Sequence, residues 1–144
     1  MNERLAIGVG ARSGVDADEL VMLVKRVAAQ LIAQSARPHP HRSPEETWRP
    51  PLFTIDTKRD EPGLHEAARL LNTTIFFLPL EALLARKDDV LTRSARVEAL
   101  MGIGSVAEAA ALAGAGRASV LLGPRIATDR LTCAIARNAL DEAP

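Results

Sequence analysis

The stretch Leu5-Ala6-Ile7-Gly8-Val9-Gly10-Ala11-Arg12-Ser13-Gly14-Val15-Asp16 decides the fold class of this chain. Residues 5–9 form a short apolar run, which is typical of a buried strand. Glycines follow, and from Asp16 to about Gln34 apolar residues recur at helical spacing. A buried strand that turns directly into an amphipathic helix is the first unit of an α/β fold.

The same alternation continues along the chain. Further strands are predicted at 52–55 and 73–78, and helices at 62–71, 79–85, 93–100 and 105–113. Two last strands, 119–122 and 131–136, are separated by residues 123–130, which suit an antiparallel hairpin but are too few for a helical crossover. We expect a single α/β domain over residues 1–144, with a mixed sheet of about five strands and helices on both faces.

Composition narrows the classes of function. The chain has 18 basic and 18 acidic residues, and this balance disfavours a general nucleic-acid binder. No apolar run approaches the length of a membrane span, and the N-terminus lacks a signal peptide, so a cytoplasmic location is expected. The one cysteine, Cys133, excludes an intrachain disulfide and fits a small core residue.

The segment 37–51 differs from the rest of the chain, because it is rich in proline and shows no periodicity. It is predicted to be a loop, and a scaffold role in docking other enzymes is one interpretation of it. His39 and His41 lie within it, but two histidines alone do not make a metal site. We therefore expect no bound metal and no cofactor.

Three polar segments are candidates for a binding site. The first, Gly8 to Gly14, departs from the dinucleotide fingerprint because Ser13 stands where the third glycine would be. A loop that binds another anion, with Arg12 beside it, and a plain tight turn are both open interpretations.

The second segment, Asp56 to Gly63, is densely charged and lies between a strand and a helix start. Asp56 could act as a base or orient a ligand group, and Lys58 could pair with a carboxylate. Glu61 is expected to cap its helix. A solvated loop without a ligand would have the same composition.

The third segment, Met101 to Leu112, leads from Gly102 and Gly104 into a helix. Ser105 and Glu108 have the spacing of a capping box. The free N–H groups at such a helix start suit a carboxylate or a phosphate. The alternative is a capped helix with no ligand.

These segments and Thr132-Cys133-Ala134-Ile135-Ala136-Arg137 occur in one order along the chain, and together they resemble the cobalamin-biosynthesis family of CobE and the C-terminal domain of CbiG. The resemblance spans about Leu5 to Arg137. It implies a role in building the corrin ring of vitamin B12, a branch of porphyrin metabolism. The larger CbiG-type proteins are assigned as cobalt-precorrin-5A hydrolases, which open a lactone and release acetaldehyde, whereas a stand-alone domain looks like CobE.

The resemblance implies a precorrin as ligand, a tetrapyrrole with an apolar face and an anionic rim of acetate and propionate arms. Arg125 could also bind such a rim; the main expected ligand-binding residues are Gly8, Gly10, Arg12, Ser13, Asp56, Lys58, Gly102, Gly104 and Ser105. Many relatives carry a cysteine where this chain has Ala11, which favours binding over catalysis here. The alternative is a precorrin hydrolase with Asp56 or Glu108 as general base. Other corrin-pathway enzymes are expected partners.

Overall fold

A computed structural model describes residues 3–34 and 50–139 of the chain. Most of the predicted proline-rich loop, with His39 and His41, lies outside the described residues. The described elements are β1 (Glu3–Ala11), α1 (Ala17–Gln34), β2 (Leu52–Ile55), η2 (Asp56–Lys58), α2 (Pro62–Leu70), β3 (Ile75–Leu78), α3 (Leu80–Leu84), η3 (Lys87–Asp89), α4 (Ala95–Met101), α5 (Val106–Ala115), β4 (Val120–Leu121), β5 (Ile126–Ala127) and β6 (Leu131–Ala139).

The sheet is mixed, as the sequence predicts. In the described residues it has 6 strands, in the order β3-β2-β1-β6-β4, with β5 paired to β6. β1, β2 and β3 are parallel, whereas β6 runs antiparallel to β1 and to both β4 and β5. The predicted hairpin of the last two strands is confirmed, and β5 is an additional short strand within its connection.

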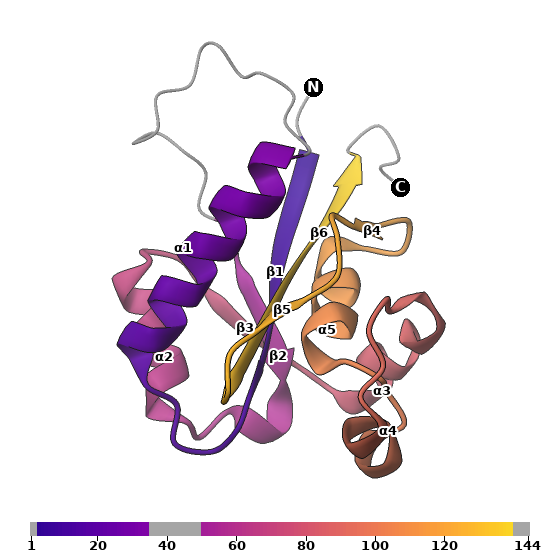
Figure 1. Cartoon of the computed structure of the whole chain (residues 1–144), viewed down its shortest axis with the longest axis horizontal. Coiled ribbons are helices and arrows are strands. Elements are labelled where there is room, and N and C mark those ends of the chain that lie inside the picture. Colours follow the sequence, from indigo (N-terminus) through magenta and orange to yellow (C-terminus); the bar gives the residue numbers. More distant parts are fainter. Residues whose placement is uncertain (1–2, 35–49, 140–144) are drawn as a thin grey trace.

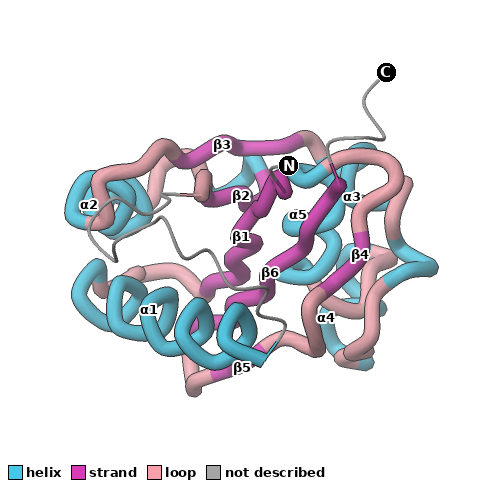
Figure 2. Tube along the Cα trace, turned by 90° about the horizontal axis from the view of Figure 1, so that it is seen from above, coloured by secondary structure: helices cyan, strands magenta, loops and turns pink. Residues whose placement is uncertain are grey.

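Helices cover both faces of the sheet (Figure 1). Figure 2 shows α1 and α2 on one side of the strands and α3, α4 and α5 on the other. The alternation of β1 divides its side chains between the two layers. Ile7 and Val9 pack with the apolar face of α1, while Ala6 packs with the alanines of α5.

Small residues let α5 approach β1 closely. A Cβ atom added at Gly8 would collide with the carbonyl oxygen of Ala107 in α5. Ala134 and Ala136 of β6 belong to the same fully buried layer. Gly8 is therefore required for packing, because any larger residue would push α5 away from the sheet.

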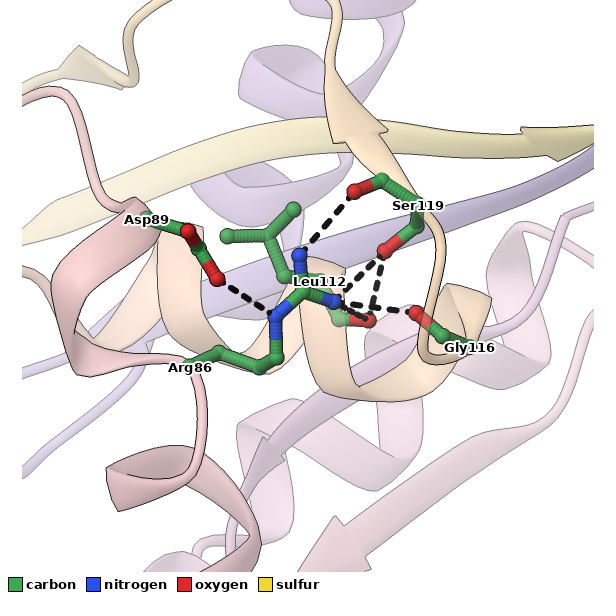
Figure 3. A network of polar contacts seen from close by, with 5 residues as sticks. All are labelled: Arg86, Asp89, Leu112, Gly116 and Ser119. Carbon is green, nitrogen blue, oxygen red and sulfur yellow. Dashed lines mark hydrogen bonds and ion pairs between the residues drawn. The ribbon is translucent and has the colours of Figure 1, made fainter.

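Arg86 fixes the C-terminal end of α5 (Figure 3). Its guanidinium donates to the carbonyl oxygens of Leu112 and Gly116, at 3.2 and 2.9 Å, and to both oxygens of Ser119. This one side chain therefore joins the last turn of α5 to the turn that leads into β4.

No single helix in the described part of the chain is long and apolar enough to cross a membrane. Helices α4 and α5 meet that length and composition only as a pair, which is bent by 62°. Most of α5 is buried in the core between the sheet and α3.

Candidate functional site

A cleft of about 530 Å³ opens at the carboxyl ends of β1 and β2. Because β6 is antiparallel to β1, the start of β6 lies at the same edge. Four parts of the chain line the cleft: Gly10 to Ser13 at the end of β1 and just after it; Thr54, Ile55, Thr57 and Lys58 around the end of β2; Ser94, Arg96, Val97, Leu100, Met101 and Val106, from the N-cap of α4 to the start of α5; and Arg125 with Ala127 to Thr132, from just before β5 to the start of β6.

The cleft is strongly basic in a chain whose formal net charge is +0. Among the described residues that line it, the only acidic side chain is Asp129, against the basic side chains of Arg12, Lys58, Arg96, Arg125 and Arg130. Within the described part of the chain, the guanidinium groups of Arg12, Arg96 and Arg125 have no hydrogen-bond or ion-pair partner. These free cations favour an anionic ligand.

One wall of the cleft is apolar. Val97, Leu100 and Met101 of α4 face it together with Val106 at the start of α5. Leu100 is 74% exposed, so much of its apolar surface is open to a ligand at the rim. The cleft therefore combines cations with an apolar surface at its rim.

The predicted ligand-binding residues separate into two groups. Gly10, Arg12, Ser13 and Lys58 line the cleft. Gly8, Asp56, Gly102, Gly104 and Ser105 do not belong to its lining. Asp56 instead begins η2, where its carbonyl oxygen accepts the N–H of Arg59 at 3.1 Å.

The glycine segment before α5 has contacts of its own. Gly102 adopts a left-handed conformation, with φ of 79°, at the C-terminal end of α4. Gly104 packs so closely against Arg93 that a Cβ atom would lie 2.8 Å from its Cγ. Ser105 is fully buried and caps α5 by accepting the N–H of Glu108 at 3.2 Å. These contacts account for the motif without a ligand.

Glu108, a predicted catalytic base, is 0% exposed and does not line the cleft. Its Oε1 accepts the N–H groups of Leu91 and Thr92, each at 2.8 Å. Its Oε2 accepts the Thr92 hydroxyl at 2.8 Å and the N–H of Arg125 at 2.7 Å. The carboxylate thus ties α5 to the segment before α4 and to the segment that carries Arg125.

Sequence reasoning missed Arg96, Asp129 and Arg130 as cleft residues. Arg130 directly precedes β6, and Ala11 at the end of β1 pairs with Leu131. Arg130 could therefore have been placed at this edge from the predicted hairpin, because the last strand of that hairpin begins beside the end of β1. Arg96 had no such signal, because only tertiary packing brings α4 to this edge.

The described residues contain no group of three or more histidine, cysteine, aspartate or glutamate side chains that could hold a metal ion. Cys133 is fully buried, and burial raises the pKa of its thiol to about 12. Such a thiol is protonated at neutral pH and is not a nucleophile.

Comparison with known proteins identifies the family. The family described as "Cobalamin synthesis G C-terminus" matches residues 5–136. The chain belongs to this family. The curated "Protein CobE" of Sinorhizobium sp is 29% identical over 135 residues, which are 94% of this chain and 80% of that protein.

Solved structures agree with this membership. The crystal structure of CobE, a protein from the cobalamin (vitamin B12) biosynthetic pathway, is 36% identical, with a TM-score of 0.78, and the match covers 96% of this chain and 92% of that one. The cobalamin biosynthesis protein chiG from Agrobacterium tumefaciens is 30% identical, with a TM-score of 0.65 and coverage of 92% and 96%. The predicted family is confirmed, and the chain is a protein of cobalamin biosynthesis.

Proposed function

We propose that the cleft binds a precorrin-type tetrapyrrole intermediate through the carboxylate arms on its rim. The observation that carries this proposal is the set of cations without a partner among the described residues, Arg12, Arg96 and Arg125, around one cleft of a chain whose formal net charge is +0. Arginine suits this task because its planar guanidinium matches a carboxylate in a two-point contact.

The apolar wall supports the same ligand class. A tetrapyrrole presents a broad apolar face, and Leu100 and Met101 offer a surface at the rim of the cleft. Burial of the exposed part of Leu100 under such a face would be favourable, since apolar area removed from water contributes roughly 25 cal/mol per Å². A small inorganic anion would make no use of this wall.

The geometry favours binding over hydrolysis. Glu108 is buried with its oxygens occupied by four donors, and Asp56 lies outside the lining of the cleft. A general base must come within hydrogen-bond reach of the proton it takes. Neither predicted base meets that condition in the cleft, so the proposal assigns the chain to binding or handing on the intermediate.

The test is a spectral titration of the purified protein with uroporphyrin, a stable tetrapyrrole that carries eight carboxylates. We expect saturable binding at micromolar concentration that weakens with added salt, because the cations are partly exposed. Arg96→Ala and Arg125→Ala should each weaken the affinity roughly fivefold. The octamethyl ester of the same porphyrin keeps the ring but not the charges, and it should not bind at this site.

The matched control is Arg4→Ala. Arg4 is an exposed arginine near the start of β1, at the opposite end of the sheet from the cleft. Its removal should leave the affinity unchanged. Equal binding of the acid and the ester, or equal losses from Arg4→Ala and Arg96→Ala, would contradict the proposal.

A further inference from the structure

The loop after β1 carries Arg12 and Ser13 into the cleft, and its backbone is held on one side by the turn before β6. The N–H of Arg12 donates to the carbonyl oxygen of Arg130 at 3.1 Å. The guanidinium of Arg130 donates to the carbonyl oxygen of Ser13 at 2.6 Å. The first half of the loop is therefore fixed by residues that also line the cleft.

The second half of the loop is held by a carboxylate from another part of the chain. Gly14 and Val15 donate their N–H groups to one oxygen, Oε1 of Glu61, at 3.0 and 3.2 Å. Successive N–H groups that converge in this way form an anion-binding concavity. Its anion here is an internal one, the carboxylate of Glu61.

The side chain of Glu61 bonds to this loop and not to its own helix. It is the N-cap residue of α2, but its side chain makes no capping hydrogen bond there. The N–H groups of Val15 and Gly14, with the charge of Lys58, hold the pKa of Glu61 below its usual range. The carboxylate is therefore charged at neutral pH, in the form that accepts both bonds.

The two residues after Glu61 allow it to reach the loop. Pro62 begins α2, at a position where its missing N–H costs little. A Cβ atom at Gly63 would collide with the carbonyl oxygen of Val15, so the close approach requires glycine. The sequence Glu61-Pro62-Gly63 thus docks the start of α2 onto the loop after β1.

We propose that Glu61 is a positioning residue of the cleft, which acts through the backbone of Gly14 and Val15 to hold Arg12 and Ser13 toward the ligand. The guanidinium of Arg12 has no partner of its own within the described residues, so its place depends on the backbone that carries it. The inference rests on the proposed function, because it assigns Glu61 to the affinity of the same cleft.

The first experiment needs no ligand. In an NMR titration with acid, the amide protons of Gly14 and Val15 should shift together, with a midpoint below the usual pKa of a glutamate. The shift should be absent in Glu61→Gln. Amide protons that do not respond to pH in the wild-type chain would overturn the inference, whatever the porphyrin titration gives.

The second experiment is a double-mutant cycle with uroporphyrin as the probe. Glu61→Ala should weaken binding roughly tenfold, whereas Glu61→Gln should stay within about threefold, since its single carbonyl oxygen can accept both N–H groups. Glu66→Ala is the control, because Glu66 lies on the same helix, is exposed and pairs only with Arg69 among the described contacts. Urea unfolding of each variant checks that the fold is retained.

The decisive comparison measures the effect of Glu61→Ala on affinity in two variant backgrounds, Arg12→Ala and Arg96→Ala. If Glu61 acts through the loop, the effect of Glu61→Ala should largely disappear in Arg12→Ala but persist in Arg96→Ala. An equal loss in both backgrounds would mean a general structural role and would overturn the inference. A wild-type chain that does not bind uroporphyrin would instead refute the proposed function and, with it, the role of Glu61 in affinity; the acid titration would still test separately whether Glu61 holds the loop.

Discussion

The buried carboxylate of Glu108 offers the sharpest test of how this fold is held together. Its four donors, at 2.7 to 2.8 Å, come from Leu91, Thr92 and Arg125. A carboxylate accepts at about four lone-pair positions, so these donors use its full capacity. Glu108→Gln keeps the shape of the side chain and removes part of that capacity.

The loss of stability expected for Glu108→Gln follows from what happens to each of the four hydrogen bonds. The amide oxygen can take the place of Oε1 and still accept the N–H groups of Leu91 and Thr92, although these bonds lose their assistance by charge. The Thr92 hydroxyl can turn and accept from the new NH2 group. The N–H of Arg125 cannot turn, so it faces another donor and loses its partner.

A hydrogen bond to a charged group contributes about 1.5–3 kcal/mol, and a neutral bond about half of that. Loss of one such bond and weakening of two others predicts that Glu108→Gln lowers the free energy of unfolding by about 2–4 kcal/mol. A domain of this size has a total stability of about 5–15 kcal/mol, so the change is large.

The assay is urea unfolding followed by far-ultraviolet circular dichroism, with the midpoints compared at a shared slope. Glu98→Gln is the control, because Glu98 forms an exposed ion pair with Arg93 at 2.8 Å, with side chains 42% and 49% exposed. Solvent screening should keep the control within about 0.5 kcal/mol of the wild type. Equal effects of Glu108→Gln and Glu98→Gln would refute the reasoning.

Three further results are expected. Gly8→Ala should lower the free energy of unfolding by about 1–3 kcal/mol in the same urea assay, because its Cβ would collide with the backbone of α5. Arg86→Lys should cost about 1–3 kcal/mol, since one ammonium cannot reach all the oxygens at the end of α5; a wild-type midpoint would contradict this. The pKa of Cys133 is raised from 9.0 to about 12, so the folded chain keeps a proton that the unfolded chain loses. Stability should therefore be unaffected by this thiol below pH 9.0 and should fall as the pH rises from 9.0 toward 12, and Cys133→Ala should remove that part of the pH dependence.

Most elements could be predicted from the sequence because their signals are local. The apolar run before Gly10 and the helical spacing after Asp16 give β1 and α1 directly. The ends of β1 were harder to predict from the sequence, because its outer residues join the strand through pairing with β6, as Glu3 does with Ala139. β5 covers only Ile126 and Ala127, which is too short for any periodic pattern.

The glycines of the predicted site make close contacts within the chain that their spacing did not specify. A Gly-x-Gly pattern indicates that another group approaches the backbone closely, but it does not indicate whether that group is a ligand or another part of the chain. At Gly8 the approaching group is α5, and at Gly104 it is the segment around Arg93. At Gly10 the hydroxyl of Thr132 comes nearest, and this glycine does line the cleft.

The two glutamates of the motifs show why the walls of the cleft could not be predicted. Both Glu61 and Glu108 lie at helix starts, where local rules assign a carboxylate to its own helix. Both carboxylates instead bond to distant parts of the chain: Glu61 to residues 46 and 47 positions earlier, and Glu108 to residues 16 and 17 positions earlier and 17 positions later. One contact holds the loop that carries Arg12, and the other holds the segment that carries Arg125. Arg12 and Arg125 therefore lie in segments that are bonded to acidic residues outside the cleft, and only the folded chain brings these residues together.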